Sequence, residues 1–183
     1  MKRKVGEIMP TNNLCKKSKV LHGWRIRLVN PIGNAPSKIF QYSIIRVQGF
    51  PTSRQISNIL ICLCPDITDA ERTALLESCS YTVYYNDGSC KELSDCFIKN
   101  TIEPPASNPV GCKGLKFDDI PHGEGHVEQT QIVLNFTLTE PLPIGSVNIG
   151  LKAGPSPTSG VWGNICGPVC KPVPVLPTRG IML

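Results

Sequence analysis

The sequence predicts a mainly β protein, an antiparallel β-sandwich of jelly-roll-like type with one short helix. Short stretches alternate apolar and polar residues, and turn-forming residues separate them. The 183 residues include 16 Gly and 17 Pro but only 6% aromatic residues, a composition typical of many short elements joined by turns. Hydrophobic residues make up 40% of the chain, which excludes a disordered protein.

Predicted strands begin at Trp24 and recur along the chain. They cover residues 24–30, 38–50, 56–65, 81–85, 114–119, 130–140 and 146–154. Segment 130–140 has the clearest alternation, with Ile132, Leu134, Phe136 and Leu138 on the face expected to point inward. Asn86-Asp87-Gly88 is a strong hairpin signal after the fourth of these strands.

One segment, residues 68–79, has the pattern of a helix. Thr68 is a good N-cap, and Glu71 three positions later completes a capping box. Leu75, Leu76 and Cys79 then fall on one side. Because helices do not alternate with the strands, the pattern favours a sandwich over an α/β fold.

Charge divides the chain into a basic N-terminal arm and a nearly neutral body. Residues 1–27 carry eight Lys or Arg against Glu7, a net charge of +7, and the rest of the chain carries −2. We expect three parts: an arm (1–22), a Cys-rich sandwich (23–170) and a Pro-rich tail (171–183). The arm has no apolar stretch after its basic residues, so we do not expect a secretory signal peptide, and no apolar run is long enough for a membrane span.

Nine cysteines are the most informative feature of the composition: Cys15, Cys62, Cys64, Cys79, Cys90, Cys96, Cys112, Cys166 and Cys170. No Cys-x-x-Cys pair occurs, which argues against a redox motif and a common zinc ribbon. A disulfide framework is the favoured interpretation, with a metal site and unrelated buried thiols as alternatives. An odd count leaves one cysteine free or bonded to another chain, and Cys15 on the arm is the expected one.

A catalytic or metal site finds little support. The best candidate is His122-Gly-Glu124-Gly-His126-Val-Glu128, but its glycines and the preceding Pro121 predict a solvated loop, and its order is not that of a metalloprotease helix. No phosphate-binding loop, dinucleotide fingerprint or nucleophile elbow occurs. We therefore expect no enzyme, no cofactor and no bound metal, and nucleic-acid binding has only the arm in its favour.

Three runs in the second half give the chain a family resemblance: GLKFDDIP, VLNFTLTEPLPIGSVNIGLKAG and ICGPVC. Over residues 40–170 the chain resembles a family of Cys-rich domains of spore-forming Firmicutes, and it is similar to the subunits of endospore appendages. The helix at residues 68–79 and the length of the basic arm depart from the family pattern.

This resemblance implies a structural subunit that polymerises into a disulfide-linked fibre on the spore surface. The resemblance also implies that the main partner of this chain is another copy of itself, and that spore coat or exosporium proteins anchor the fibre. CGPVC would be a disulfide anchor for the last strand, Cys15 would bond to a neighbouring subunit, and the apolar Ile181, Met182 and Leu183 would dock on another copy. The alternatives are a viral or phage coat or fibre subunit with a basic arm, and a surface- or carbohydrate-binding module.

Overall fold

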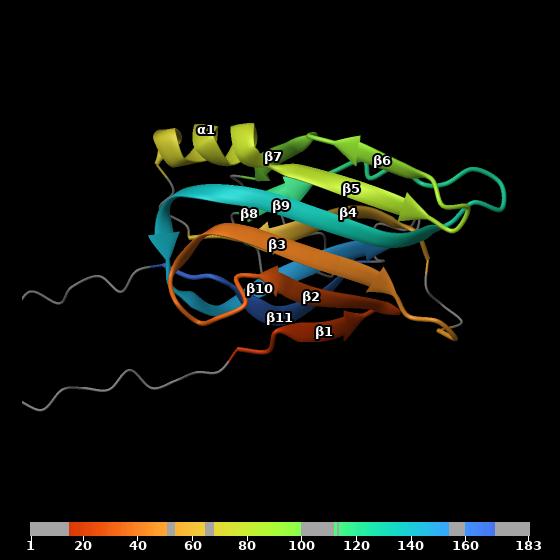
Figure 1. Cartoon of the computed structure of the whole chain (residues 1–183), viewed down its shortest axis with the longest axis horizontal. Coiled ribbons are helices and arrows are strands. Elements are labelled where there is room, and N and C mark those ends of the chain that lie inside the picture. Colours follow the sequence, from red (N-terminus) through yellow and green to blue (C-terminus); the bar gives the residue numbers. More distant parts are fainter. Residues whose placement is uncertain are drawn as a thin grey trace, which may run out of the picture.

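Two antiparallel sheets packed face to face form the molecule (Figure 1). The computed structural model describes residues 15–50, 54–64, 68–99, 112, 114–153 and 160–170. Every strand pairing in this part of the chain is antiparallel. The predicted antiparallel β-sandwich with one short helix is confirmed.

The first sheet has the strand order β1-β2-β3-β9-β5-β6, and the second has the order β11-β10-β4-β8-β7. The strands of the first sheet are β1 (Ser18–Leu21), β2 (Trp24–Asn30), β3 (Ser37–Arg46), β9 (Gln129–Leu142), β5 (Ser80–Tyr85) and β6 (Cys90–Leu93). Those of the second are β11 (Gly160–Pro168), β10 (Ile144–Ala153), β4 (Ile56–Cys62), β8 (Gly114–Phe117) and β7 (Cys96–Lys99).

The core lies between the two sheets and is built by the predicted alternation. In β9, Ile132, Leu134 and Phe136 are buried, while Leu138 is half-buried near the end of the sandwich. Residues from both sheets close the same layer, and the largest fully buried side chains are Trp24, Tyr42, Tyr81, Phe40, Phe117 and Phe136. Each such side chain contributes about 1.5–3 kcal/mol by leaving water, so this layer is the main source of stability.

The helix α1 (Asp69–Ser78) covers one end of the sandwich and forms as the sequence predicts. The hydroxyl of Thr68 accepts a hydrogen bond from the Glu71 backbone, and the Glu71 carboxylate accepts one from the Thr68 backbone. Leu75 is 1% exposed and joins the core. The capping box fixes the start of the helix, and Leu75 fixes which side faces inward.

Residues 18–21 belong to the sandwich, so the predicted boundary of the arm at residue 22 is wrong. They form β1, which pairs with β2 across a two-residue turn at His22 and Gly23. Both turn residues have positive φ (48° and 77°), the conformation that matches the twist of a hairpin. Leu21 is 8% exposed, and its burial in the core stabilises the pairing of β1 with β2.

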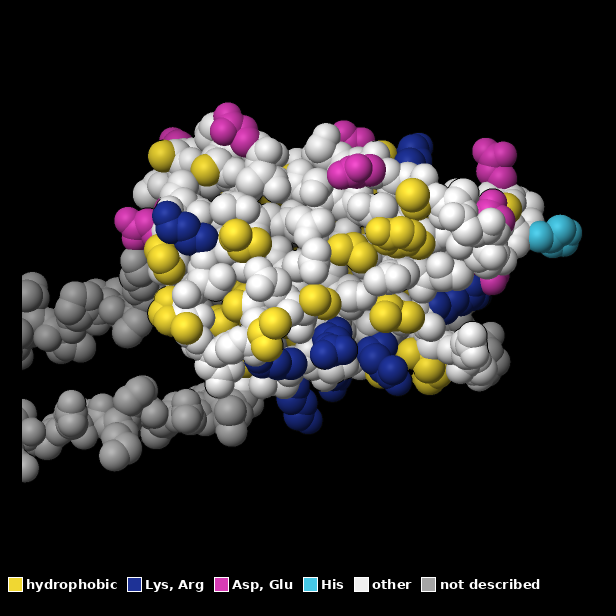
Figure 2. All heavy atoms as spheres, viewed as in Figure 1, with side chains coloured by type: hydrophobic (Ala, Val, Ile, Leu, Met, Phe, Trp, Pro, Cys, Tyr) yellow, Lys and Arg dark blue, Asp and Glu magenta, His cyan; other side chains and the backbone are white. Residues whose placement is uncertain are grey.

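The outer face of the first sheet is charged at its margins (Figure 2). Figure 2 shows Lys and Arg gathered over β1 and β2, and Asp and Glu mainly over α1 and the opposite margin. Between them lie exposed apolar side chains, including Ile39, Ile45 and Tyr84. One margin of the first sheet is therefore basic, and the opposite side of the molecule, with α1, is mainly acidic.

Candidate functional site: a disulfide-linked pole

Four disulfides include eight of the nine cysteines and form the framework that the sequence predicts. They join Cys15 to Cys166, Cys62 to Cys112, Cys64 to Cys170 and Cys79 to Cys96. Their Cα–Cα distances are 5.0, 5.6, 5.3 and 6.6 Å, within the range that a disulfide spans. A disulfide-rich β-sandwich is thus the class of protein that the fold and its cross-links define.

Cys15 is not the odd cysteine, and the prediction that it bonds to a neighbouring subunit is wrong for this structure. It is bonded to Cys166 of the same chain, 151 residues away. The Cys166 backbone N–H also donates to the Lys16 carbonyl oxygen at 2.9 Å, so the start of the described chain runs beside β11. Because β1 pairs with β2, Cys15 is held close to Cys166. The spacing of the cysteines in the sequence did not reveal this proximity.

The free cysteine is instead Cys90, which is exposed at the start of β6. Among the described strands, β6 has a neighbour only on the β5 side. The sequence placed Cys90 directly after the Asn86-Asp87-Gly88 turn, but nothing in the spacing of the cysteines marked it as the odd one. Which cysteines meet is decided by strand pairing over long separations.

Two of the disulfides meet at one end of the sandwich, which we call the pole and define by Cys15, Cys64, Cys166 and Cys170. Cys166 and Cys170 are the cysteines of the CGPVC segment, and each bonds to a different part of the chain. Figure 1 shows the described chain entering before β1 and leaving after β11 at this same end. The segment therefore anchors the end of β11 to the start of β1 and to the end of β4.

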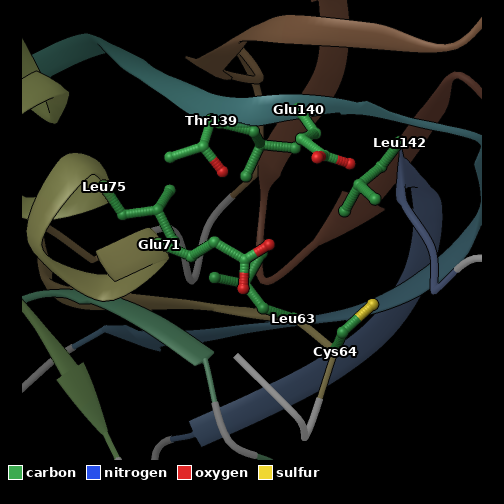
Figure 3. Close-up of a pocket in the computed structure, with 8 residues that line it drawn as sticks. Leu63, Cys64, Glu71, Leu75, Thr139, Glu140 and Leu142 are labelled. Atoms are coloured by element: carbon green, nitrogen blue, oxygen red, sulfur yellow. The ribbon is translucent and has the colours of Figure 1, made fainter. Parts of the chain in front are cut away.

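An apolar pocket opens beside the pole (Figure 3). The end of β4, the helix α1 and the end of β9 supply its three sides, with lining residues Leu63, Cys64, Glu71, Leu75, Leu138, Thr139, Glu140 and Leu142. Its volume of about 80 Å³ suits one or two apolar side chains rather than a large ligand. Because Cys64 lines it and bonds to Cys170, the chain leaves the pole at the edge of the pocket.

The leucines of the pocket are accompanied by two carboxylates. Glu71 lines the pocket, and its carboxylate is held by hydrogen bonds from the Thr68 backbone N–H and hydroxyl. Glu140 lies on the opposite side, on β9, and Figure 3 shows both residues among the side chains that line the pocket. An apolar pocket lined by two carboxylates favours an apolar segment that also carries a cation.

Buried polar groups near the pole have structural partners. The Tyr42 hydroxyl donates to the Cys166 carbonyl oxygen at 3.0 Å and ties the core of the first sheet to β11. Burial raises the pKa of the Tyr42 phenol well above its ordinary value. The phenol is therefore protonated at neutral pH and acts as a hydrogen-bond donor.

The HGEGHVE segment forms a loop, as predicted, and its side chains do not converge. His122, Glu124 and His126 are exposed, and Glu128 pairs with Arg46 on β3. The His126 carbonyl oxygen accepts from the Asn86 side chain, so the loop is held through its backbone. Within the described ranges, no three His, Cys, Asp or Glu residues are placed to hold a metal ion.

The remaining predicted contact residues, Ile181, Met182 and Leu183, lie outside the described residues. In the part of the chain that the structure describes, no helix has the length and apolar character needed to cross a membrane. No protein-family model and no curated protein matches this sequence.

Proposed function

We propose that this chain is a structural subunit that assembles with copies of itself into an extracellular or spore-surface fibre. The observation that carries the proposal is the pole, where two disulfides fasten both outgoing segments of the chain to one end of a β-sandwich. A subunit that is held to its neighbours through its terminal segments needs such attachment points. A binding module that acts as a monomer has no comparable need for them.

The pocket supplies a place for a neighbour to dock. We assign it to the C-terminal segment 171–183 of a second copy, whose Ile181, Met182 and Leu183 follow Arg179. The leucines would receive the apolar residues, and the carboxylates of Glu71 and Glu140 in the lining would attract the cation. The thirteen residues of segment 171–183 reach about 40 Å in an extended proline-rich conformation. The first sheet, with six strands at about 4.8 Å spacing, is about 24 Å wide. The segment is therefore long enough to cross to an adjacent copy.

Cys90 takes the place of Cys15 in this proposal as the cysteine through which copies are cross-linked. Its thiol is exposed on a strand at the margin of the first sheet. The basic margin of that sheet and the mainly acidic opposite side of the molecule (Figure 2) would favour a head-to-tail arrangement of copies, which extends rather than closing as a dimer.

The place of action follows from the cross-links. Four disulfides fit an extracellular or secreted protein, because such bonds persist in oxidising surroundings. We propose the spore surface in particular, with spore coat or exosporium proteins as the anchors of the fibre. A protein that is made inside a mother cell and deposited on the spore is exposed when the mother cell lyses. Its cysteines would then be oxidised on the spore surface, without export across a membrane.

The test is sedimentation of the full oxidised chain over a range of concentrations, with and without the variant Ile181→Ser/Met182→Ser/Leu183→Ser. The unaltered chain is expected to form large species, and the triple variant is expected to raise the concentration required at least tenfold. Ile45→Ser is the matched control, because it removes an apolar side chain that is 45% exposed on the outer face of β3. Equal sedimentation of the triple variant and the unaltered chain would refute the assignment of the pocket.

A further inference from the structure

The pole also determines how a pulling force would travel through the molecule. Cys15, at the start of the described chain, is bonded to Cys166. Cys170 follows Cys166 by only four residues. We propose that the Cys15–Cys166 disulfide is a load bypass. Tension between the segment before Cys15 and the segment after Cys170 passes through this bond and the CGPVC segment, so the last residues of β11 are the part of the sandwich that carries it.

The lengths of the two covalent routes decide this. Through the disulfide the route consists of a 5.0 Å Cα–Cα step and the short CGPVC segment, a total of about 20 Å when extended. Through the backbone the route from Cys15 to Cys170 holds about 155 residues, or about 540 Å when extended. The short route becomes taut first, and no strand lies in series with the load except the last residues of β11.

The second disulfide of the pole acts as a reserve. If the Cys15–Cys166 bond is absent, the load runs from Cys15 along the chain to Cys64 and crosses to Cys170. That route covers β1, β2, β3 and β4 and contains about 49 residues, or about 17 nm when extended. The strands from β5 onward remain outside it. The two bonds therefore limit extension in two steps.

The other two disulfides do not share this role. Cys62–Cys112 and Cys79–Cys96 each join residues that both lie between Cys15 and Cys166 in the sequence. Opening either of them leaves the short route intact. They provide matched controls, because each removes one cross-link from the same sandwich without touching the load path.

The source of the tension rests on the proposed function, since neighbours in a fibre would pull on the two terminal segments. The bypass itself depends only on the connectivity of the chain. A chain that stays monomeric yet shows the bypass would refute the fibre and leave this inference standing. A single oxidised chain that unfolds when it is pulled through its two terminal segments would refute this inference alone.

The experiment is single-molecule force spectroscopy on the full chain, tethered through peptide tags fused to both ends and pulled in non-reducing buffer. The unaltered chain is expected to show no unfolding step before the tether detaches. Cys15→Ser/Cys166→Ser is expected to show an extension of about 17 nm, and Cys79→Ser/Cys96→Ser is expected to show none. Should the first variant fail to fold, a reductant added to the unaltered chain provides the second measurement, with the stretch from Cys15 to Cys170 extending to about 54 nm.

A step of about 17 nm or more in the oxidised unaltered chain would overturn the proposal, because the sandwich would then be carrying load. A folded Cys15→Ser/Cys166→Ser variant that extends no further than the unaltered chain would overturn it equally.

Discussion

Gln129 is the polar side chain whose replacement should damage this sandwich most. It begins β9 in the first sheet and is fully buried. Its Oε1 accepts from the Ile56 backbone N–H at 2.6 Å, and its Nε2 donates to the Ile56 carbonyl oxygen at 3.0 Å. Because Ile56 begins β4 in the second sheet, the amide joins the two sheets as a backbone bridge would.

The Gln129 amide makes a third hydrogen bond, in which Nε2 donates to the Pro121 carbonyl oxygen at 2.9 Å. Replacing Gln129 with Met keeps the volume but removes all three bonds. A buried backbone group left without its partner costs about 1–3 kcal/mol. With two such groups at Ile56, we expect Gln129→Met to lower the free energy of unfolding by about 2–6 kcal/mol. That is a large part of the roughly 5–15 kcal/mol of a typical domain.

Urea unfolding of the oxidised chain measures this loss. The matched control is Gln131→Met, two residues along the same strand, where the side chain is half-buried and donates to the Ser43 hydroxyl at 2.9 Å. We expect that control to cost about 1 kcal/mol or less.

Gln129→Glu separates hydrogen bonding from packing by its pH dependence. Burial raises the pKa of an introduced carboxyl above its unfolded value of about 4.3. Its contribution to stability is therefore fully present below about pH 4.3 and is lost as the pH rises through the folded pKa. The deficit of this variant should shrink on acidification, whereas that of Gln129→Met should change little. If Gln129→Met costs no more than Gln131→Met, or if Gln129→Glu and Gln129→Met show the same deficit at every pH, the bridge is not what stabilises this position.

The cross-links, the buried phenol and the exposed histidines each lead to further predictions. Alkylation of the unfolded, unreduced monomer should label one thiol per chain, at Cys90, and reduction should raise the number to nine; three or more labelled thiols before reduction would contradict the framework. Tyr42→Phe should cost about 1 kcal/mol through the lost bond to the Cys166 carbonyl oxygen. Because the folded pKa of this phenol is raised, the unaltered chain should also lose stability as the pH rises above about 10, where the unfolded phenol ionises; a Tyr42 that titrates with free tyrosine while the chain is folded would show that it is not buried. Replacing both His122 and His126 with Ala should leave unfolding and sedimentation unchanged, since both side chains are exposed, and a loss of assembly that chelators reproduce would reveal a metal site.

Local patterns predicted the elements whose side chains alternate cleanly. β2, β3, β9 and β10 match the predicted strands within a few residues, and α1 begins at the predicted N-cap. In these elements the spacing of the apolar residues and the helix cap indicate the same structure, so the sequence alone is enough to predict them.

The strand β11 could not be predicted in this way, because glycine is common in it and disfavours a strand. Its glycines are explained by contacts that only the folded chain makes. A Cβ at Gly163 would lie 2.9 Å from the Leu21 side chain, and one at Gly167 would lie 2.5 Å from the Tyr42 hydroxyl oxygen. The small residues allow β11 to approach β1 and the core, so their reason lies in packing rather than in propensity.

The candidate site was predicted in part. Cysteine density predicted the framework, and the CGPVC segment marked an anchor. The partners of its cysteines lie 106 and 151 residues away, and only the arrangement of β1, β4 and β11 brings them together. The apolar pocket likewise needs the ends of β4 and β9 beside α1, a proximity that no local pattern contains.

The central claim, that this sandwich is a self-assembling structural subunit, is tested most directly by imaging. Negative-stain electron microscopy of the full, oxidised chain at rising concentration should show fibres of uniform width. Adding reductant should loosen or shorten them, because the proposed cross-links at Cys90 and the pole both depend on disulfides. Monodisperse single sandwiches at every concentration, under conditions where alkylation confirms the four disulfides, would contradict the claim.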